Sequence, residues 1–404
     1  MSVKKTYNVK TLLRAGALLA VAVTGGNLAQ AQTSSPSCSD SWTGNAGNGL
    51  WSTASNWSTH KVPGLTSDVC IPTLTTADAT PPISVHSLQV SEGASLLIGS
   101  GKAGARFSIA TSLTNQGFIT LTGTTLSAGS IDLPAPGEID SYDNSSITSP
   151  AFSNTGTVSV GTGGTLRLAD NPVQLENGTL SGGNWLVAGA LIVPSDISQL
   201  TSQGTVVSID GTGSAVEDTS GNNALATLTS VGPGTVLALF EGASLTVAQD
   251  LTSQGVVDVG SGSGASLTVR GTYTQASGAT TNMGAGSLSA TSVSVQPGST
   301  LQGSGTVASS ITNNGTVAPQ GSLTVTGNYT QTAALTEQFG STLHVNSNAT
   351  LSGALNVTIN PKRPPKSGAA YTALTFGSLD GSFTGHTAGF TLTTSANSIQ
   401  VTKQ

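Results

Sequence analysis

The chain has 404 residues, of which 8% are charged and 4% are aromatic, and its formal net charge is −6 at pH 7. This mildly acidic balance without a basic patch argues against nucleic-acid binding. Ordinary globular domains carry about 25% charged residues, so this chain builds its polar surface mainly from uncharged side chains.

Residues 1–31 have the features of a secretory signal peptide: a basic start, the apolar run ALLAVAVTGG and a small-x-small cleavage site, Ala-Gln-Ala. The basic residues are Lys4, Lys5, Lys10 and Arg14. Cleavage would remove four of the 13 basic residues and none of the 19 acidic ones, leaving a formal charge of −10. The apolar run is too short to cross a bilayer, so we expect an exported bacterial protein with no integral membrane segment.

The segment 32–75 contains three of the four tryptophans, Trp42, Trp51 and Trp57, among small, polar and turn-forming residues. Two interpretations are open. Exposed, coplanar rings would form a platform that stacks on sugars, whereas buried rings would cap the open end of a repeat structure. The surrounding Gly, Asn and Pro-Gly turns favour a compact N-terminal cap.

The two cysteines, Cys38 and Cys70, both belong to this exported segment. An oxidising compartment favours a disulfide between them, and two separate free thiols are the alternative. The bridge would close a loop of about 30 residues and stabilise the fold by roughly 3 kcal/mol in the chain-entropy model.

From residue 76 to 360 the sequence alternates apolar and polar residues in short runs, as in SLQVSEGASLLIG and TVSVGTGGTLRLA. Alternation with period two predicts half-buried β-strands. Gly, Ser and Thr are too dense for a sustained helical period. We therefore predict an all-β protein.

These runs also repeat, because LTNQGFITL, FSNTGTVSV, LTSQGTVVSI, LTSQGVVDV and ITNNGTVAP share one form. The glycines that mark the form are Gly117, Gly156, Gly204, Gly255 and Gly315. We expect them to supply the positive φ of a tight corner. A single repeat cannot bury its apolar face alone, so the pattern predicts a parallel β-solenoid of about a dozen coils.

Two other all-β architectures fit the alternation less well. A chain of β-sandwich domains would also show a strand every 8–12 residues or so. An outer-membrane barrel would need aromatic girdles at both interfaces, and the eight Phe and five Tyr are scattered.

The composition of the sequence changes near residue 361, where the segment NPKRPPKSG contains three prolines. Proline at this density stops a solenoid strand. The remaining segment, 361–404, carries Phe376, Phe383 and Phe390 at fairly even spacing. We expect a C-terminal β-module that covers the last coil and its edge strand.

The opening segment resembles one found at the start of bacterial secreted and surface β-helix proteins with autotransporter passenger (adhesin-like) repeats. The residues that match are Trp42, Trp51, Asn56, Trp57, Val62, Pro63, Gly64 and Asp68. The stretch 293–331 is similar to the passenger repeats of the same proteins, and no segment resembles their membrane barrel. Cys70 stands where the family strand carries an aliphatic residue. The resemblance implies an architecture more than an activity.

β-Helices also include polysaccharide-degrading enzymes, and glycoside hydrolysis requires a pair of carboxyl groups. Glu138, Asp140 and Asp143 lie together in GEIDSYDNSS, and Glu217 precedes Asp218 in another loop. Glu138 and Asp140 would share one strand face. Solvated loop acids are the favoured interpretation, and a calcium site is an alternative. We assign no catalytic, cofactor or metal residue.

The sequence as a whole predicts a structural or adhesin-like β-helix protein that presents an elongated polar surface outside a bacterial cell, either secreted or at the cell surface. Its expected partners are extracellular polysaccharides or cell-surface components, and we expect no enzymatic activity. The alternative is a carbohydrate-binding or polysaccharide-degrading β-helix protein, with the three tryptophans or the Glu138–Asp143 stretch involved.

Overall fold

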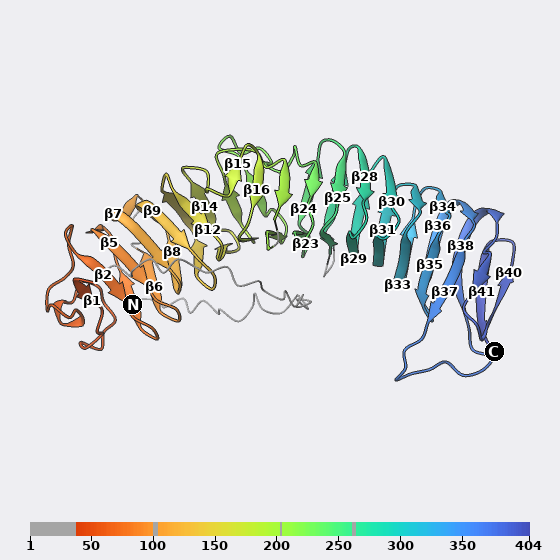
Figure 1. The fold of residues 1–404 in the computed structure, drawn as a ribbon, viewed down its shortest axis with the longest axis horizontal. Helices are drawn as coiled ribbons and strands as arrows, with labels where there is room; N and C mark the ends of the chain where they lie inside the picture. Colours follow the sequence, from red (N-terminus) through yellow and green to blue (C-terminus); the bar gives the residue numbers. More distant parts are fainter. Residues whose placement is uncertain (1–37, 100–103, 203, 261–263) are drawn as a thin grey trace. The chain divides into compact units, whose positions relative to one another are not determined.

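The computed structural model describes residues 38–404 except 100–103, 203 and 261–263, so the expected signal peptide, residues 1–31, lies outside the described residues. The described part is all-β and winds into a parallel β-solenoid of about 14 turns, which confirms the predicted fold class (Figure 1). The number of turns is close to the dozen coils expected from the sequence.

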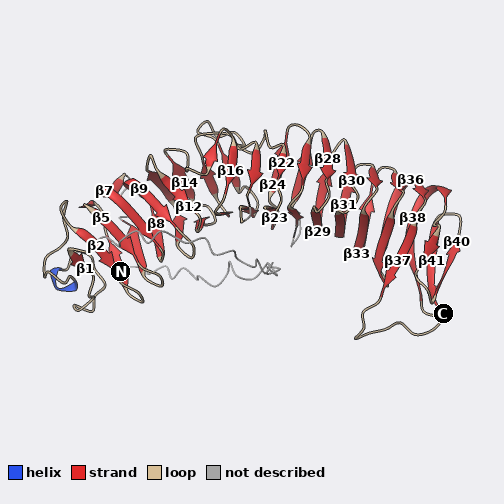
Figure 2. Cartoon of the chain, in the orientation of Figure 1, coloured by secondary structure: helices blue, strands red, loops and turns tan. Residues whose placement is uncertain are grey.

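Strands follow one another along almost the whole described chain, and one short 3-10 turn, η1 (Ala54–Asn56), lies near its start (Figure 2). Strands of successive coils pair in parallel and form three long series, which we name ladders A, B and C. A few long strands bend at a bulge and contribute to two ladders.

Ladder A is continuous, and each of its strands pairs in parallel with the next. Its strands are β3 (Thr76–Ala79), β6 (Ser95–Gly99), β8 (Phe118–Thr122), β10 (Glu138–Tyr142), β13 (Thr157–Val160), β17 (Asn184–Val187), β20 (Val206–Asp210), β23 (Val236–Phe240), β26 (Val256–Val259), the first parts of β29 (Thr280–Ser289), β31 (Thr300–Ala308) and β33 (Thr316–Val325), then β35 (Ala334–Gln338), β37 (Ala354–Thr358) and β39 (Gly385–His386).

Ladder B is interrupted at an antiparallel pair, β15 (Leu175–Glu176) with β16 (Thr179–Ser181). Before it come β1 (Asp40–Ser41), β2 (Asp68–Ile71), β5 (Ser87–Val90), the second parts of β7 (Ala105–Asn115) and β9 (Thr124–Leu133), and β12 (Phe152–Asn154). After it β16 is followed by β19 (Gln199–Thr201), β22 (Ser230–Val231), β25 (Leu251–Ser253), β28 (Thr272–Gln275), β30 (Ser292–Val295), β32 (Ile311–Asn313), β34 (Tyr329–Gln331), and the second parts of β36 (Thr342–Leu351) and β38 (Ala370–Gly381).

Ladder C begins with β4 (Ile83–Val85) and the first parts of β7 and β9, and it continues through β11 (Asn144–Thr148), β14 (Thr165–Leu168), β18 (Ala190–Ile192) and β21 (Ala215–Glu217). It resumes at β24 (Ser244–Val247) and β27 (Ser266–Val269), followed by parts of β29, β31, β33, β36 and β38.

Alternation within the strands builds the core, because every second side chain points into the coil. In ladder A the inward side chains of successive strands stack on one another in register. From β8 to β23 this buried column is Ile119, Ile139, Val158, Trp185, Val207 and Leu237. Each coil therefore buries its apolar face against its neighbours, as the repeat pattern predicts.

Most of the marker glycines do not supply the positive φ of a tight corner that the sequence suggests. Of the five, Gly204 has a positive φ, +86°, whereas Gly117, Gly156, Gly255 and Gly315 do not. A Cβ added at Gly156, Gly255 or Gly315 would lie 2.3, 2.4 or 2.3 Å from a carbonyl oxygen of the preceding coil, and 2.5 Å at Gly117. The positive-φ prediction is wrong for these four, which are required because the backbones of two coils approach closely.

At two of the marker glycines, Gly117 and Gly315, an Asn two residues earlier binds the backbone of two coils. Asn115 Oδ1 accepts the Gly117 N–H at 3.1 Å, and its Nδ2 donates to the Glu138 carbonyl at 2.8 Å. Asn313 repeats both bonds, with the Gly315 N–H at 3.1 Å and the Ala334 carbonyl at 2.9 Å. The side chain therefore satisfies backbone groups of two successive coils at a buried corner.

The chain leaves the parallel winding at its C-terminal end. β41 (Ser398–Lys403) pairs antiparallel with β38 on one side and with β40 (Phe390–Thr394) on the other. Phe376 and Phe390 are buried, and Phe383 packs against the core from a partly buried position.

Candidate functional site

The outward face of ladder A carries a group of ionisable side chains on β10. Because the strand alternates, Ile139 and Ser141 point into the coil and are fully buried, whereas Glu138, Asp140 and Tyr142 point outward. The structure therefore brings Glu138 and Asp140 together on one strand face, two residues apart.

The two carboxyl groups interact, and each affects the protonation of the other. Glu138 donates a hydrogen bond to Asp140, and Asp140 also accepts one from Ser159 on the next strand of the ladder. Burial, followed by the charge of Asp140, raises the pKa of Glu138 to about 7. Burial also raises the pKa of Asp140. The pair therefore keeps one proton up to near-neutral pH, since two adjacent carboxylates do not ionise together easily.

Apolar and aromatic side chains border the carboxyl pair. Phe118 is the direct neighbour of Glu138 on β8 and is 44% exposed; Leu97 on β6 is 42% exposed but is separated from Asp140 by Thr120 of β8. The Tyr142 ring lies over Gly161, because a Cβ added there would come within 2.5 Å of the ring. Burial and then the charges of Asp140 and Glu138 raise the pKa of the Tyr142 phenol, which therefore stays a neutral hydrogen-bonding group.

This arrangement constrains what the site can do chemically. A retaining glycosidase needs carboxyl groups about 5–5.5 Å apart, and an inverting enzyme needs about 6.5–9.5 Å. Glu138 and Asp140 interact with each other through their side chains. Within the described ranges, no group of three or more His, Cys, Asp and Glu side chains is arranged to hold a metal ion.

Asp143, the third acid of the sequence motif, lies apart from this pair at the exposed corner after β10. Its backbone has φ +56°, and its carbonyl accepts the Thr165 N–H at 2.8 Å. The second acidic loop is also a turn structure: Asp218 accepts the Ser220 and Asn222 N–H groups at 2.7 and 2.9 Å. The hydrogen bond from the Asn222 side chain is the main cause of the lowered pKa of Asp218.

The three N-terminal tryptophans lie inside the fold. Trp42, Trp51 and Trp57 are 2%, 1% and 0% exposed. Trp57 meets Trp42 and Trp51 edge to face at 5.0 and 4.6 Å between centroids, and Trp51 meets Phe107 of β7 at 5.3 Å. Buried rings offer no face to a sugar, so the interpretation of these residues as a glycan platform is wrong. They pack against the first coils.

The predicted disulfide is present. Cys38 and Cys70 are bonded across a sequence separation of 32 residues, with Cα atoms 5.8 Å apart. Cys70 belongs to β2, and β1, which begins two residues after Cys38, pairs with the same strand. The bridge thus holds the start of the described chain on the first strands of ladder B.

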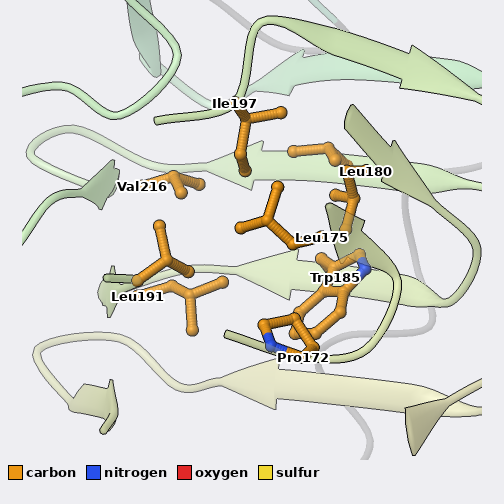
Figure 3. Close-up of a pocket in the computed structure, with 9 residues that line it drawn as sticks. Pro172, Leu175, Leu180, Trp185, Leu191, Ile197 and Val216 are labelled. Carbon is orange, nitrogen blue, oxygen red and sulfur yellow. The ribbon is translucent and has the colours of Figure 1, made fainter. Parts of the chain in front are cut away.

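The apolar cavity at the interruption of ladder B is a packing gap. Its volume is about 10 Å³, and Leu175, Leu180, Ile197 and the ring of the fourth tryptophan, Trp185, line it (Figure 3). A water molecule needs roughly 10–15 Å³ and two to four polar partners. The lining side chains are apolar, so we assign no ligand to this cavity.

Sequence reasoning missed Phe118 as a surface residue, although a signal was present. In LTNQGFITL the apolar residues Ile119 and Leu121 fix the inward phase, and Phe118 therefore falls on the outward phase. The segment also lies directly before the carboxylates in the ladder. A large aromatic residue at an outward position of a strand is unusual, and here it indicates a surface site. Because β8 pairs with β10, the Phe118 ring lies beside Glu138.

No family model, no curated protein and no solved structure matches this chain. The part of the chain that the structure describes contains no helix that is long and apolar enough to cross a membrane.

Proposed function

We propose that the protein is an exported bacterial β-solenoid with a structural or adhesin-like role, which contacts its partner through the polar outward faces of its ladders. The observation that carries this proposal is a column of outward polar side chains in ladder B, in register over successive coils. The column consists of Ser230, Thr252, Thr274, Ser294, Thr312, Thr330, Thr350 and Asp380.

A repeated column favours adhesion because each coil presents nearly the same hydroxyl group to the outside. Single hydroxyl contacts with a wet surface are weak. Many of them held in one rigid row act together, so their combined affinity exceeds that of any one contact. A partner with its own regularly spaced hydroxyl groups, such as an extracellular polysaccharide, suits this geometry.

Two further features support a location outside the cell. The Cys38–Cys70 disulfide suits an oxidising compartment. The first 31 residues have the composition of a secretory leader.

The experiment is a co-sedimentation panel with the purified mature protein, insoluble polysaccharides and intact bacterial cells. The supernatant is assayed for newly released sugar ends. Binding without release supports the proposal, and binding to none of the surfaces contradicts an adhesive role. Two variants test which face makes the contact, Thr312→Lys on ladder B and the matched Thr324→Lys on ladder C. Each replaces an outward threonine by a charged residue, and we expect only Thr312→Lys to weaken binding.

Carbohydrate binding at β8 and β10 is the second candidate function, and the exposed Phe118 ring beside the carboxyl pair favours it. Aromatic faces stack on sugars, and carboxyl groups hydrogen-bond to hydroxyl groups. Phe118→Ala would then abolish pelleting with the glycan, whereas Leu74→Ala, at another exposed apolar residue, would not. Release of sugar ends that is lost in Glu138→Gln would instead support an enzyme.

A further inference from the structure

Glu337 on β35 points into the coil, at a position where a carboxyl group is unexpected. The strand reads Ala-Leu-Thr-Glu-Gln, and its alternation turns Leu335 and Glu337 inward. Glu337 is fully buried, and its register partner on β37 is Val357. An acidic side chain thus occupies a core position of one of the last coils.

The contacts of Glu337 tie three strands together. The Tyr371 hydroxyl donates to Glu337 Oε2 at 3.2 Å, and the Leu343 backbone N–H donates to the same carboxyl group. Tyr371 lies on β38, and Leu343 lies on β36. Through Tyr371 the carboxyl group therefore reaches the strand on which the antiparallel C-terminal strands are built.

The second oxygen, Glu337 Oε1, is buried and has no hydrogen-bond partner. Tyr329 on β34 is the other ionisable group close to the carboxyl. Its hydroxyl receives the Asn313 amide at 3.0 Å and donates to Gln331 Oε1 at 2.9 Å, so its proton is committed elsewhere. Nothing in the described surroundings donates to Glu337 Oε1.

The Tyr371 ring, whose hydroxyl binds Glu337, belongs to an aromatic cluster. Phe339 meets the Tyr371 ring at 4.6 Å and the Phe390 ring at 6.1 Å. The Lys403 ammonium lies 5.1 Å from the Phe390 centroid and donates to the Gly389 carbonyl.

The remaining ionisable groups on the neighbouring strands are also engaged away from Glu337. His344 Nδ1 lies 2.8 Å from Thr375 Oγ1, His386 Nε2 lies 3.0 Å from the Phe390 carbonyl oxygen, and Asp380 accepts the Asn348 amide at 2.9 Å. In the described part of the chain, no cation is in contact with the carboxyl group to balance a charge on it.

The neutral form of Glu337 therefore suits this site far better than the carboxylate. An ionised group would leave a charged oxygen buried without a donor, which is among the most unfavourable situations in a protein core. Burial accordingly raises the pKa of Glu337 well above its ordinary value. The pKa of Tyr371 is also raised by burial, so its hydroxyl remains a donor through the same pH range.

We propose that Glu337 is a protonation-dependent latch: while its carboxyl is neutral, β38 and β41 stay packed on the last coils, and when the proton is lost the buried, incompletely paired charge releases these strands. Opening exposes Glu337 to water, where it ionises at its ordinary pKa. A rising pH therefore favours the open state progressively, while the parallel coils beyond this end stay closed.

Hydrogen exchange of the full mature chain tests this proposal, with Glu337→Gln as the matched variant that cannot ionise. For each amide the exchange rate of the wild type is divided by that of the variant at the same pH, which removes the chemical pH dependence. In β38 and β41 this ratio should be about one near pH 4.5 and rise about tenfold per pH unit above it, levelling off at the folded-state pKa. Amides of β8, at the far end of ladder A, should keep a ratio near one.

A ratio that stays flat with pH in β38 and β41 would overturn the latch, as would an equal rise in β8. Tyr371→Phe gives a second test that does not require the glutamine variant to fold. It removes the hydrogen bond that stabilises the carboxylate, so the rise with pH should continue to a higher pH than in the wild type. An unchanged profile in this variant would also overturn the proposal.

Discussion

Ladder A carries two acidic sites, one with its side chains on the outer face of the solenoid and one with its side chain in the core. Glu138 and Asp140 point outward from β10, interact with each other and have Ser159 as a further partner. Glu337 points inward from β35, has no second carboxyl and keeps an oxygen without a partner. Burial raises the pKa of a carboxyl at both sites, but at the outward site a neighbouring charge contributes as well. A raised pKa can therefore accompany either a surface site or a core contact, and the direction of the side chain distinguishes them.

Aromatic residues also occur both in the core and on the surface of the solenoid, and we expect the largest loss of stability from removing a buried one. Trp57 is buried between Trp42 and Trp51 and donates from Nε1 to the Trp51 carbonyl at 2.8 Å. Trp57→Ala should lower the free energy of unfolding by about 3–5 kcal/mol, because it leaves a large cavity and an unpaired carbonyl. Chemical denaturation at neutral pH measures this change, and a loss below about 1 kcal/mol would contradict the packing role.

Removing the inward carboxyl should have the next largest effect. Glu337→Ala deletes a buried side chain and leaves the Tyr371 hydroxyl without its acceptor, so we expect a loss of about 2–4 kcal/mol near pH 5. Glu138→Ala, its outward counterpart on the same ladder, should change the free energy of unfolding by about 0.5 kcal/mol or less under the same conditions. Equal losses in the two variants would remove the distinction between the sites.

The sequence was sufficient to predict the class of fold and much less of the site. Period-two alternation and the recurring marker glycines predict stacked parallel coils, because both patterns can be read from short stretches of the sequence. The reason for Gly156 or Gly315 was not accessible in this way, since the distance between two coils is a tertiary quantity. For the same reason the cluster of tryptophans was visible in the sequence, whereas its packing partner, the Phe107 ring of β7, was not.

The two acidic sites show a similar limit. The spacing of Glu138 and Asp140 indicates a shared strand face, and the structure places both there. Their hydrogen bond and the neighbouring Phe118 depend on the pairing of β8, β10 and β13, which no single strand encodes. Glu337 stands at an inward phase in ALTEQ, and its partner Tyr371 is 34 residues further along the chain.

The outward pair should produce a smaller, pH-dependent effect on stability. Since the folded-state pKa of Glu138 is about 7 and its ordinary value is 4.5, the folded protein holds more protons than the unfolded chain between these values. The wild type therefore loses stability as the pH rises through this window. Because the group is partly exposed and screened by solvent, we expect a loss of about 1 kcal/mol. Glu138→Gln should remove this contribution, so the wild type should lose about 1 kcal/mol more than the variant across the window, whereas the loss due to Glu337 is common to both proteins. Denaturation midpoints of both proteins on both sides of the window measure the difference.

Phe118→Ala should have the smallest effect on stability, in contrast to Trp57→Ala. The ring is 44% exposed and contributes mainly to contacts across the strand pairs of ladder A. Such contacts are worth about 0.2–1 kcal/mol, so the free energy of unfolding should fall by about 0.5 kcal/mol. Phe118→Tyr keeps the ring and serves as the control. A loss as large as that of Trp57→Ala would mean that Phe118 belongs to the core, and the carboxyl pair would then have no exposed aromatic neighbour with which to bind a sugar.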